Sequence, residues 1–100
     1  MSPREIAAEQ ALELLAAAAR DEITFRILRK ASDAPAETTL FHAQQAIEKG
    51  LKAALVSAGV VFRRTHDLLE LLDLASTENL VVPVERALLA RLAPYAVEFR

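Results

Sequence analysis

The sequence predicts an all-α protein, folded as an antiparallel bundle of four to five helices. Apolar residues recur at helical spacing, every third or fourth position, along most of the chain. The two glycines and four prolines lie where a protein of helical hairpins has its turns. Val60, Val61 and Phe62 form an apolar connector that is too short to indicate a sheet. Since 100 residues leave room for one core, we expect a single domain over residues 1–100.

The first predicted helix begins at Pro3 and runs to about residue 30. Ser2 and Glu5 have the spacing of a capping box, and proline is favoured at the first helical position. The apolar residues of this helix lie on two sides. One side carries Leu12, Leu15, Ala16, Ala19, Ile23 and Ile27, and the opposite side carries Leu14, Ala18, Phe25 and Leu28. A helix with two apolar sides is usually sandwiched between neighbours.

This helix has more apolar surface than a short chain can enclose. Apolar residues make up 53% of the sequence and mean hydropathy is +0.20, yet a domain of this size has little interior. The alternative explanation is that alanine, a good helix former, inflates the count. We expect a homodimer whose contact buries side chains of the first or second helix.

Three further helices are expected. The second covers residues 36–58 and ends at Gly59, a common C-terminal signal. Thr65 caps the third, with Asp67 in its first turn, where negative charge suits the helix dipole. The fourth begins at Pro83, and Pro94 should kink or break it, because proline removes a backbone hydrogen bond. The apolar stripes of the three helices are Leu40, Ala43, Ile47, Leu51, Ala54, Leu55 and Ala58; Leu68, Leu71, Leu72 and Ala75; and Val84, Leu88, Leu92, Tyr95 and Phe99.

Composition excludes several classes of protein. The lack of cysteine rules out disulfides and thiolate metal sites, and suits a reducing compartment. The longest apolar run, residues 14–19, is far shorter than the roughly twenty residues of a membrane-spanning helix. The N-terminus has no signal-peptide features, so we expect a cytoplasmic protein. A net charge of −2 and a pI of about 5.7 give no overall attraction to nucleic acid or anionic membrane.

The second predicted helix carries one group of candidate binding residues. At 100° per residue, the polar face opposite its apolar stripe holds His42, Gln45, Lys49 and Lys52. These lysines either contact an anionic ligand or belong to a solvated face that a Glu48–Lys52 pair stabilises. Gln44 falls inside the apolar sector, where an unpartnered amide costs roughly 1–3 kcal/mol. It is either a core or interface glutamine bonded to a backbone carbonyl, or a ligand contact.

The other group is Arg63-Arg64-Thr65-His66-Asp67, immediately before the third helix. Two guanidinium groups beside a helix N-terminus would bind an anion, because the free amides and the helix dipole point the same way. A turn with two solvated arginines explains the same residues. His66, Glu70 and Asp73 share a face at metal-like spacing, but one histidine with two exposed carboxylates is too weak a set to predict a metal.

Catalytic motifs are not found. The chain has no cysteine, and none of its four serines lies in a nucleophile elbow or beside a plausible base. Gly50 and Gly59 are the only glycines, so there is no glycine-rich phosphate loop. We therefore assign no catalytic residue, no metal and no cofactor.

Two segments of the sequence resemble the HEPN family. Residues 41–55 read Phe-His-Ala-Gln-Gln-Ala-Ile-Glu-Lys-Gly-Leu-Lys-Ala-Ala-Leu, and Arg64-Thr65-His66-Asp67-Leu68 follows after the apolar connector. The family commonly shows a very similar Phe-His-Ala-Gln-Gln-Ala-x-Glu-Lys-x-Leu-Lys-Ala helix, and then a Thr-His-Asp-Leu start to the next. Ala19-Arg20-Asp21 and residues 95–100 fit more loosely, so the likeness covers nearly the whole chain.

The resemblance implies a helical bundle, usually dimeric, that is often encoded beside a small nucleotidyltransferase and can form a toxin–antitoxin pair with it. Some members bind nucleotides, and many are metal-independent ribonucleases that use an arginine and a histidine spaced by four to six residues. No arginine lies at that distance before His42 or His66. Similar proteins usually continue into one more helix, where a histidine could pair with Arg100.

The expected function is that of a non-catalytic module that binds a nucleotide or a nucleotidyltransferase partner. The expected anion contacts are Gln45, Lys49, Arg63, Arg64, Thr65 and His66. One alternative is a ribonuclease toxin, acting on RNA, whose catalytic pair is completed beyond Arg100. Another is a purely structural dimerisation domain.

Overall fold

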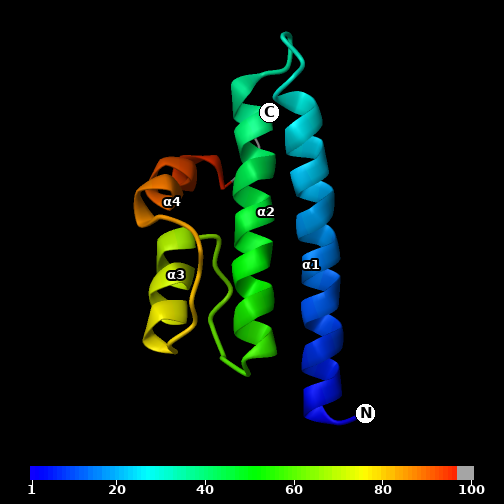
Figure 1. Cartoon of the computed structure of the whole chain (residues 1–100), viewed down its shortest axis with the longest axis vertical. Helices are drawn as coiled ribbons and strands as arrows, with labels where there is room; N and C mark the ends of the chain where they lie inside the picture. The colour runs from blue at the N-terminus through cyan, green and yellow to red at the C-terminus, as the bar shows by residue number, and fades with distance from the viewer. Residues whose placement is uncertain (97–100) are drawn as a thin grey trace.

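Two long antiparallel helices form the central hairpin of the molecule. The computed structural model describes residues 1–96 and places α1 at Pro3–Leu28 and α2 at Ala36–Ser57 (Figure 1). Two shorter helices follow, α3 at Leu68–Thr77 and α4 at Arg86–Leu92, and a 3₁₀ turn at Ala93–Tyr95. The residues described contain no strand. The predicted all-α bundle is therefore confirmed, with four α-helices.

The central helix is α2. Figure 1 shows α1 along one side of α2, and α3 with α4 along the other. Because α1 packs chiefly against α2, its far side has no neighbour within residues 1–96. The predicted α1–α2 hairpin is confirmed, and its length makes the molecule elongated, with extents of 47 × 28 × 24 Å.

The apolar core lies between α2 and the α3–α4 side. Leu55 of α2, Leu68 and Leu71 of α3, and Leu89 of α4 have no exposed surface. The remaining core members are Leu51, Leu72, Ala75 and Leu92. These residues include the predicted buried side of α3, whose four members are all confirmed.

Local signals set most helix ends. At the start of α1, the Ser2 hydroxyl accepts from the Glu5 amide at 3.2 Å and the Glu5 carboxylate accepts from the Ser2 amide at 3.3 Å, as predicted. Gly59, with φ of 74°, ends α2 in a Schellman motif, in which the Val60 amide donates to the Leu55 carbonyl at 2.9 Å. Asn79, with φ of 59°, has the same role after α3.

Two predicted helix starts are wrong. Asp67, rather than Thr65, caps α3, and its carboxylate accepts from the amides of Leu69 and Glu70. Thr65 is buried, and its hydroxyl accepts from the Asp67 amide, so it cannot reach the first turn of the helix. The fourth helix begins at Arg86 rather than Pro83, because Val84 packs against the core in the segment that leads into it.

The prediction for Pro94 is confirmed. The α-helix ends at Leu92 and the chain continues as a 3₁₀ turn that contains Pro94. Proline fits there because its ring and missing N–H exclude it from the interior of an α-helix. The predicted stripe residue Phe99 lies outside the residues described.

Two features of the long helices have no explanation in the contacts among residues 1–96. The outer side of α1 exposes Leu12, Leu15, Ile23 and Ile27. Gly50 lies in the middle of α2, where glycine costs about 1 kcal/mol relative to alanine, yet a Cβ there would meet nothing within 4 Å. None of the helices described is long and apolar enough to cross a membrane.

We expect Leu55→Ala to lower the free energy of unfolding by roughly 2–5 kcal/mol, because it leaves a cavity beside three other buried leucines. Val81 is 96% exposed, so Val81→Ala should change stability by no more than about 0.5 kcal/mol. Urea unfolding followed by circular dichroism measures both. Equal losses in the two variants would contradict the assignment of the core.

Candidate functional site

The most concentrated polar chemistry lies along one side of α2, where two carboxylates are held out of water. The first belongs to Asp21 of α1, which is 8% exposed. Its Oδ1 lies 2.9 Å from Nδ1 of His42, and its Oδ2 accepts from Nζ of Lys49 at 2.5 Å. One carboxylate thus joins α1 to two successive stretches of α2.

The sequence places Asp21 at this contact through helical periodicity. Asp21 falls in the inner row of α1, one turn from Ala18 and from Phe25. His42 and Lys49 are seven residues apart, so they lie two turns apart on the same side of α2. Burial alone would raise the pKa of Asp21, but its hydrogen bonds to Lys49 and His42 outweigh burial and hold the pKa below its ordinary value.

The second carboxylate belongs to Glu48 of α2, which is 3% exposed. It accepts from Nε2 of Gln44 at 3.0 Å and from Nζ of Lys52 at 3.1 Å. The imidazole Nδ1 of His66, in the segment before α3, lies 3.0 Å from Glu48 Oε2. Burial would raise the pKa of Glu48, yet these hydrogen bonds from Gln44, His66 and Lys52 hold it below its usual value.

Gln44 connects this cluster to the core. It is fully buried, and its Nε2 also lies 3.3 Å from the backbone carbonyl of His66. Its Oε1 accepts from Nε2 of Gln45 at 2.7 Å. The structure therefore bears out the interpretation of Gln44 as a core glutamine bonded to a backbone carbonyl. The predicted Glu48–Lys52 pair is also confirmed, although its carboxylate is buried instead of solvated.

Both histidines are oriented in the same way. A carboxylate only accepts hydrogen bonds, so Nδ1 of each imidazole carries the proton. Nε2 is the ring nitrogen left for a ligand. The His66 side chain is 61% exposed, whereas that of His42 is 22% exposed. His66 is thus the imidazole with better access to a ligand.

The two predicted arginines have different surroundings. Nε and Nη2 of Arg63 both donate to the Glu70 carboxylate, at 2.8 Å and 2.5 Å, and this pairing raises the pKa of Arg63 above its usual value. Arg64 is exposed and forms no side-chain hydrogen bond or ion pair within residues 1–96. Its charge is the one in this segment available to a ligand.

The helix amides expected to assist these arginines are partly occupied. The Asp67 carboxylate takes the amides of Leu69 and Glu70 at the start of α3, and the Thr65 hydroxyl takes that of Asp67. Any anion bound here therefore relies on side chains more than on the helix terminus.

In the described part of the chain, His66, Glu70 and Asp73 do not converge on a common point where a metal could bind. Glu70 is paired with Arg63, Asp73 with Arg86, and His66 with Glu48. No group of three potential metal ligands forms within residues 1–96.

Sequence reasoning missed the two buried carboxylates. Asp21 lies at a position that belongs to the apolar inner row of α1, and that placement was the available signal. Glu48 lies between Gln44 and Lys52 at helical spacing, which indicated a surface pair but not its burial.

Comparison with known proteins gives one finding. The family model for the HEPN domain matches residues 8–100, which is most of the chain. No curated protein and no solved structure gives a significant match. The matched range contains both carboxylate clusters and the segment that carries Arg64 and His66.

We expect Glu48→Gln to make the free energy of unfolding depend less on pH in the acid range. Because the pKa of Glu48 is lower in the folded chain than in the unfolded one, its contribution to stability is complete well above the ordinary glutamate pKa of about 4.3 and is lost as the pH falls below that value. The substitution should cost about 1–3 kcal/mol at pH 7 and less at pH 3. Urea unfolding across this range measures the effect. Glu78→Gln, at an exposed position, is the control, and an equal change there would contradict the role of Glu48.

Proposed function

This chain belongs to the HEPN family, and from that premise we propose that it is a binding module for a phosphate-bearing ligand of the nucleotide type. One observation supports the proposal above all. A pair of ammonium groups, supplied by Lys49 and Lys52, lies along one side of α2 and is oriented by the buried carboxylates of Asp21 and Glu48.

The carboxylates would pre-organise the site, and the negative charge of each is balanced by the lysine that it touches. Asp21 and Glu48 are almost wholly buried, so they fix the cationic side chains from within the molecule. An ammonium group has three N–H donors, and within residues 1–96 Lys49 and Lys52 form one hydrogen bond each. The remaining donors are free for phosphate oxygens. Holding the groups in place beforehand reduces the entropy lost on binding.

Arg64 would supply the charge that the lysines cannot. Each lysine is balanced by the carboxylate it touches, whereas Arg64 has no such partner within residues 1–96. A guanidinium group binds phosphate through two parallel hydrogen bonds, which suits a terminal phosphate of a nucleotide. The amide oxygen of Gln45, which accepts no hydrogen bond within residues 1–96, would accept one from a hydroxyl or amino group of the nucleotide. The buried Thr65 would hold the segment before α3 through its hydrogen bond with the Asp67 amide, which keeps His66 in place.

The family resemblance extends this proposal to a nucleotidyltransferase partner and to a toxin–antitoxin pair. A protein that carries or transfers a nucleotide would meet the same set of donors. The rival function is a ribonuclease completed by a histidine paired with Arg100, which lies outside the residues described. The His66–Glu48 pair is the feature that favours this rival, because a carboxylate-oriented imidazole is a typical general acid–base group.

We expect Arg64→Ala to weaken nucleotide binding at least tenfold, a loss of about 1.4 kcal/mol. Arg63→Ala is the matched control, since Arg63 is already neutralised by Glu70 and should change binding less than threefold. Isothermal titration of ATP and of inorganic phosphate into the chain, at low salt, measures both. Equal effects of the two substitutions, or no binding of either probe, would contradict the proposal.

We expect the purified 100-residue chain to leave RNA intact, because its histidines lack an arginine at the family's catalytic spacing. Gel analysis of a labelled RNA after prolonged incubation tests this. Cleavage that disappears in His66→Ala but persists in His42→Ala would favour the ribonuclease instead.

A further inference from the structure

We propose that a groove along α2 binds an aliphatic carboxylic acid, with the carboxylate at Arg29 and the hydrocarbon chain over Ile47 and Gly50. We call it the α2 groove, and it consists of two adjoining hollows. Successive side chains of a helix are set about 100° apart, so Ile47 and Gly50 lie nearly opposite Lys49 and Lys52. The α2 groove is therefore distinct from the polar side of α2 described above.

The first hollow is wholly apolar. It lies between α2 and the segment that joins α3 to α4, and its volume is about 240 Å³. Its walls are Ile47, Gly50, Leu51 and Ala54 of α2 with Val81, Val82, Pro83 and Val84. No side chain among these can form a hydrogen bond. Since an apolar cavity of about 150 Å³ holds a molecule of the size of benzene, this hollow can hold an alkyl group.

Gly50 keeps the first hollow open. Glycine weakens the middle of a helix, and the backbone at this position does not require it, since only Gly59 among the glycines has positive φ. A Cβ at position 50 would meet nothing within 4 Å, so packing among residues 1–96 does not require glycine either. A ligand that lies against the α2 backbone would require it, because a larger side chain would take its place.

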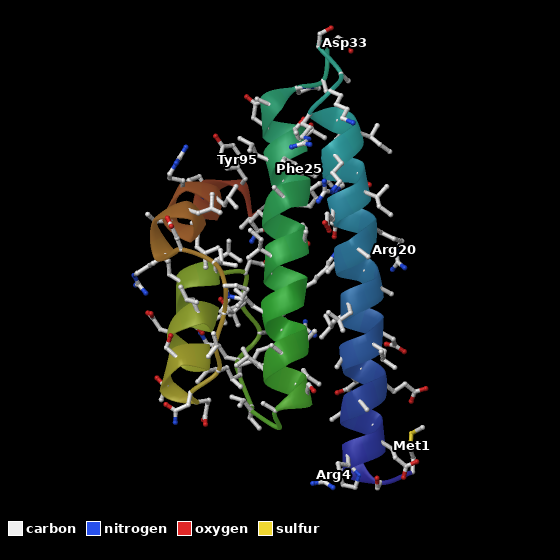
Figure 2. The ribbon with its side chains drawn as sticks, in the orientation of Figure 1. Met1, Arg4, Arg20, Phe25, Asp33 and Tyr95 are labelled. Atoms are coloured by element: carbon white, nitrogen blue, oxygen red, sulfur yellow. The ribbon has the colours of Figure 1, made fainter. Side chains whose placement is uncertain are left out.

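The second hollow adjoins the first at Ile47, which lines both. It has a volume of about 380 Å³ and lies between the C-terminal half of α1 and α2. Figure 2 shows Phe25 projecting from α1 toward α2 near the turn of the hairpin, whereas Arg20 points outward. The α2 wall is Ala43, Ala46 and Ile47, and the α1 wall is Glu22, Phe25, Arg26 and Arg29. The apolar surface thus continues into a hollow that carries charge on one wall.

Arg29 gives the second hollow its net positive charge. Glu22 and Arg26 form an ion pair at 3.1 Å and neutralise each other. Arg29 forms no side-chain hydrogen bond or ion pair within residues 1–96, and its guanidinium carbon lies 5.9 Å from the centre of the Phe25 ring. This cation–π contact holds the guanidinium beside an apolar surface. Its N–H donors remain available, and a guanidinium binds a carboxylate through two parallel hydrogen bonds.

The dimensions of the α2 groove select the class of ligand. Ala43 and Gly50 are seven residues apart, so the two hollows are centred about 10 Å apart along α2. An extended hydrocarbon chain advances about 1.3 Å per carbon, so a tail of about eight to ten carbons spans this length. One carboxylate matches the one unpaired guanidinium. A nucleotide does not suit the α2 groove, because the first hollow offers no polar side chain to a base or a sugar.

The first test is a titration of decanoate, below its micellar concentration, into the full ¹⁵N-labelled chain, followed by NMR. We expect the amide signals of Gly50 and Val82 to shift, and Gly50→Leu to weaken binding at least tenfold. Urea unfolding should show that Gly50→Leu is at least as stable as the wild type, because it adds a better helix former where there is space. Ala90→Leu, at an exposed position on α4, is the matched control and should bind decanoate as the wild type does.

The second test addresses the carboxylate. Arg29→Ala should weaken decanoate binding at least fivefold and leave the binding of 1-decanol unchanged, because the alcohol has the same tail without the charge. Arg20→Ala, an exposed arginine of α1 outside the groove, is the control and should change decanoate binding less than twofold. Equal losses of decanoate and decanol in Arg29→Ala overturn the assignment of the carboxylate to Arg29.

The proposal is overturned by a wild-type chain that shows no shifts with 2 mM decanoate, and also by a Gly50→Leu variant that binds it normally. It is likewise overturned if decanoate does not bind and the wild type sediments as a larger species than Gly50→Leu, since a second copy would then cover the α2 groove. Each of these results leaves the nucleotide titrations of Arg64→Ala and Arg63→Ala unaffected, so the two proposals fail separately.

Discussion

The arrangement of the helices depends on the burial of two ionised carboxylates, Asp21 and Glu48. A charge withdrawn from water costs several kcal/mol unless it is paired and hydrogen-bonded. Asp21 meets this requirement with His42 and Lys49, and Glu48 meets it with donors from α2 and from the segment before α3. Apolar contacts alone would tolerate sliding of α1 along α2. The carboxylates remove that freedom, because a small shift would leave a charge without its partners.

The sides of α2 differ in what they pack against and in the side chains that they carry. The side with Leu51 and Leu55 packs against α3 and α4 and makes the core. The side that carries Lys49 and Lys52 holds its ammonium groups in place through their ion pairs with Asp21 and Glu48. The side with Gly50 and Ala54 has almost no side-chain bulk and continues into the exposed aliphatic row of α1.

Sequence patterns correctly predicted the features of the fold that depend on residues close together in the chain. The capping box at Ser2, the end of α2 at Gly59 and the break at Pro94 were all predicted, because each involves residues within a few positions of one another. The placement of Gln44 in the apolar sector also predicted a buried amide that needs partners. The cap of α3 was assigned to Thr65 instead of Asp67, since both types of residue cap helices and only packing decides between them.

The sequence by itself determined the class of fold, the helices and the family, since periodicity, turn residues and motif spacing are properties of the chain in one dimension. Only the tertiary structure decided which charged side chains are neutralised by a partner within the chain. Arg63 and Arg64 are indistinguishable as neighbours in a sequence, yet a bidentate contact with Glu70 neutralises one, while the other meets no partner in residues 1–96. Likewise, Asp21 became a buried link between helices because α2 brings an imidazole and an ammonium group to it from positions more than twenty residues away. Such pairings arise from distances in space, which no local pattern encodes.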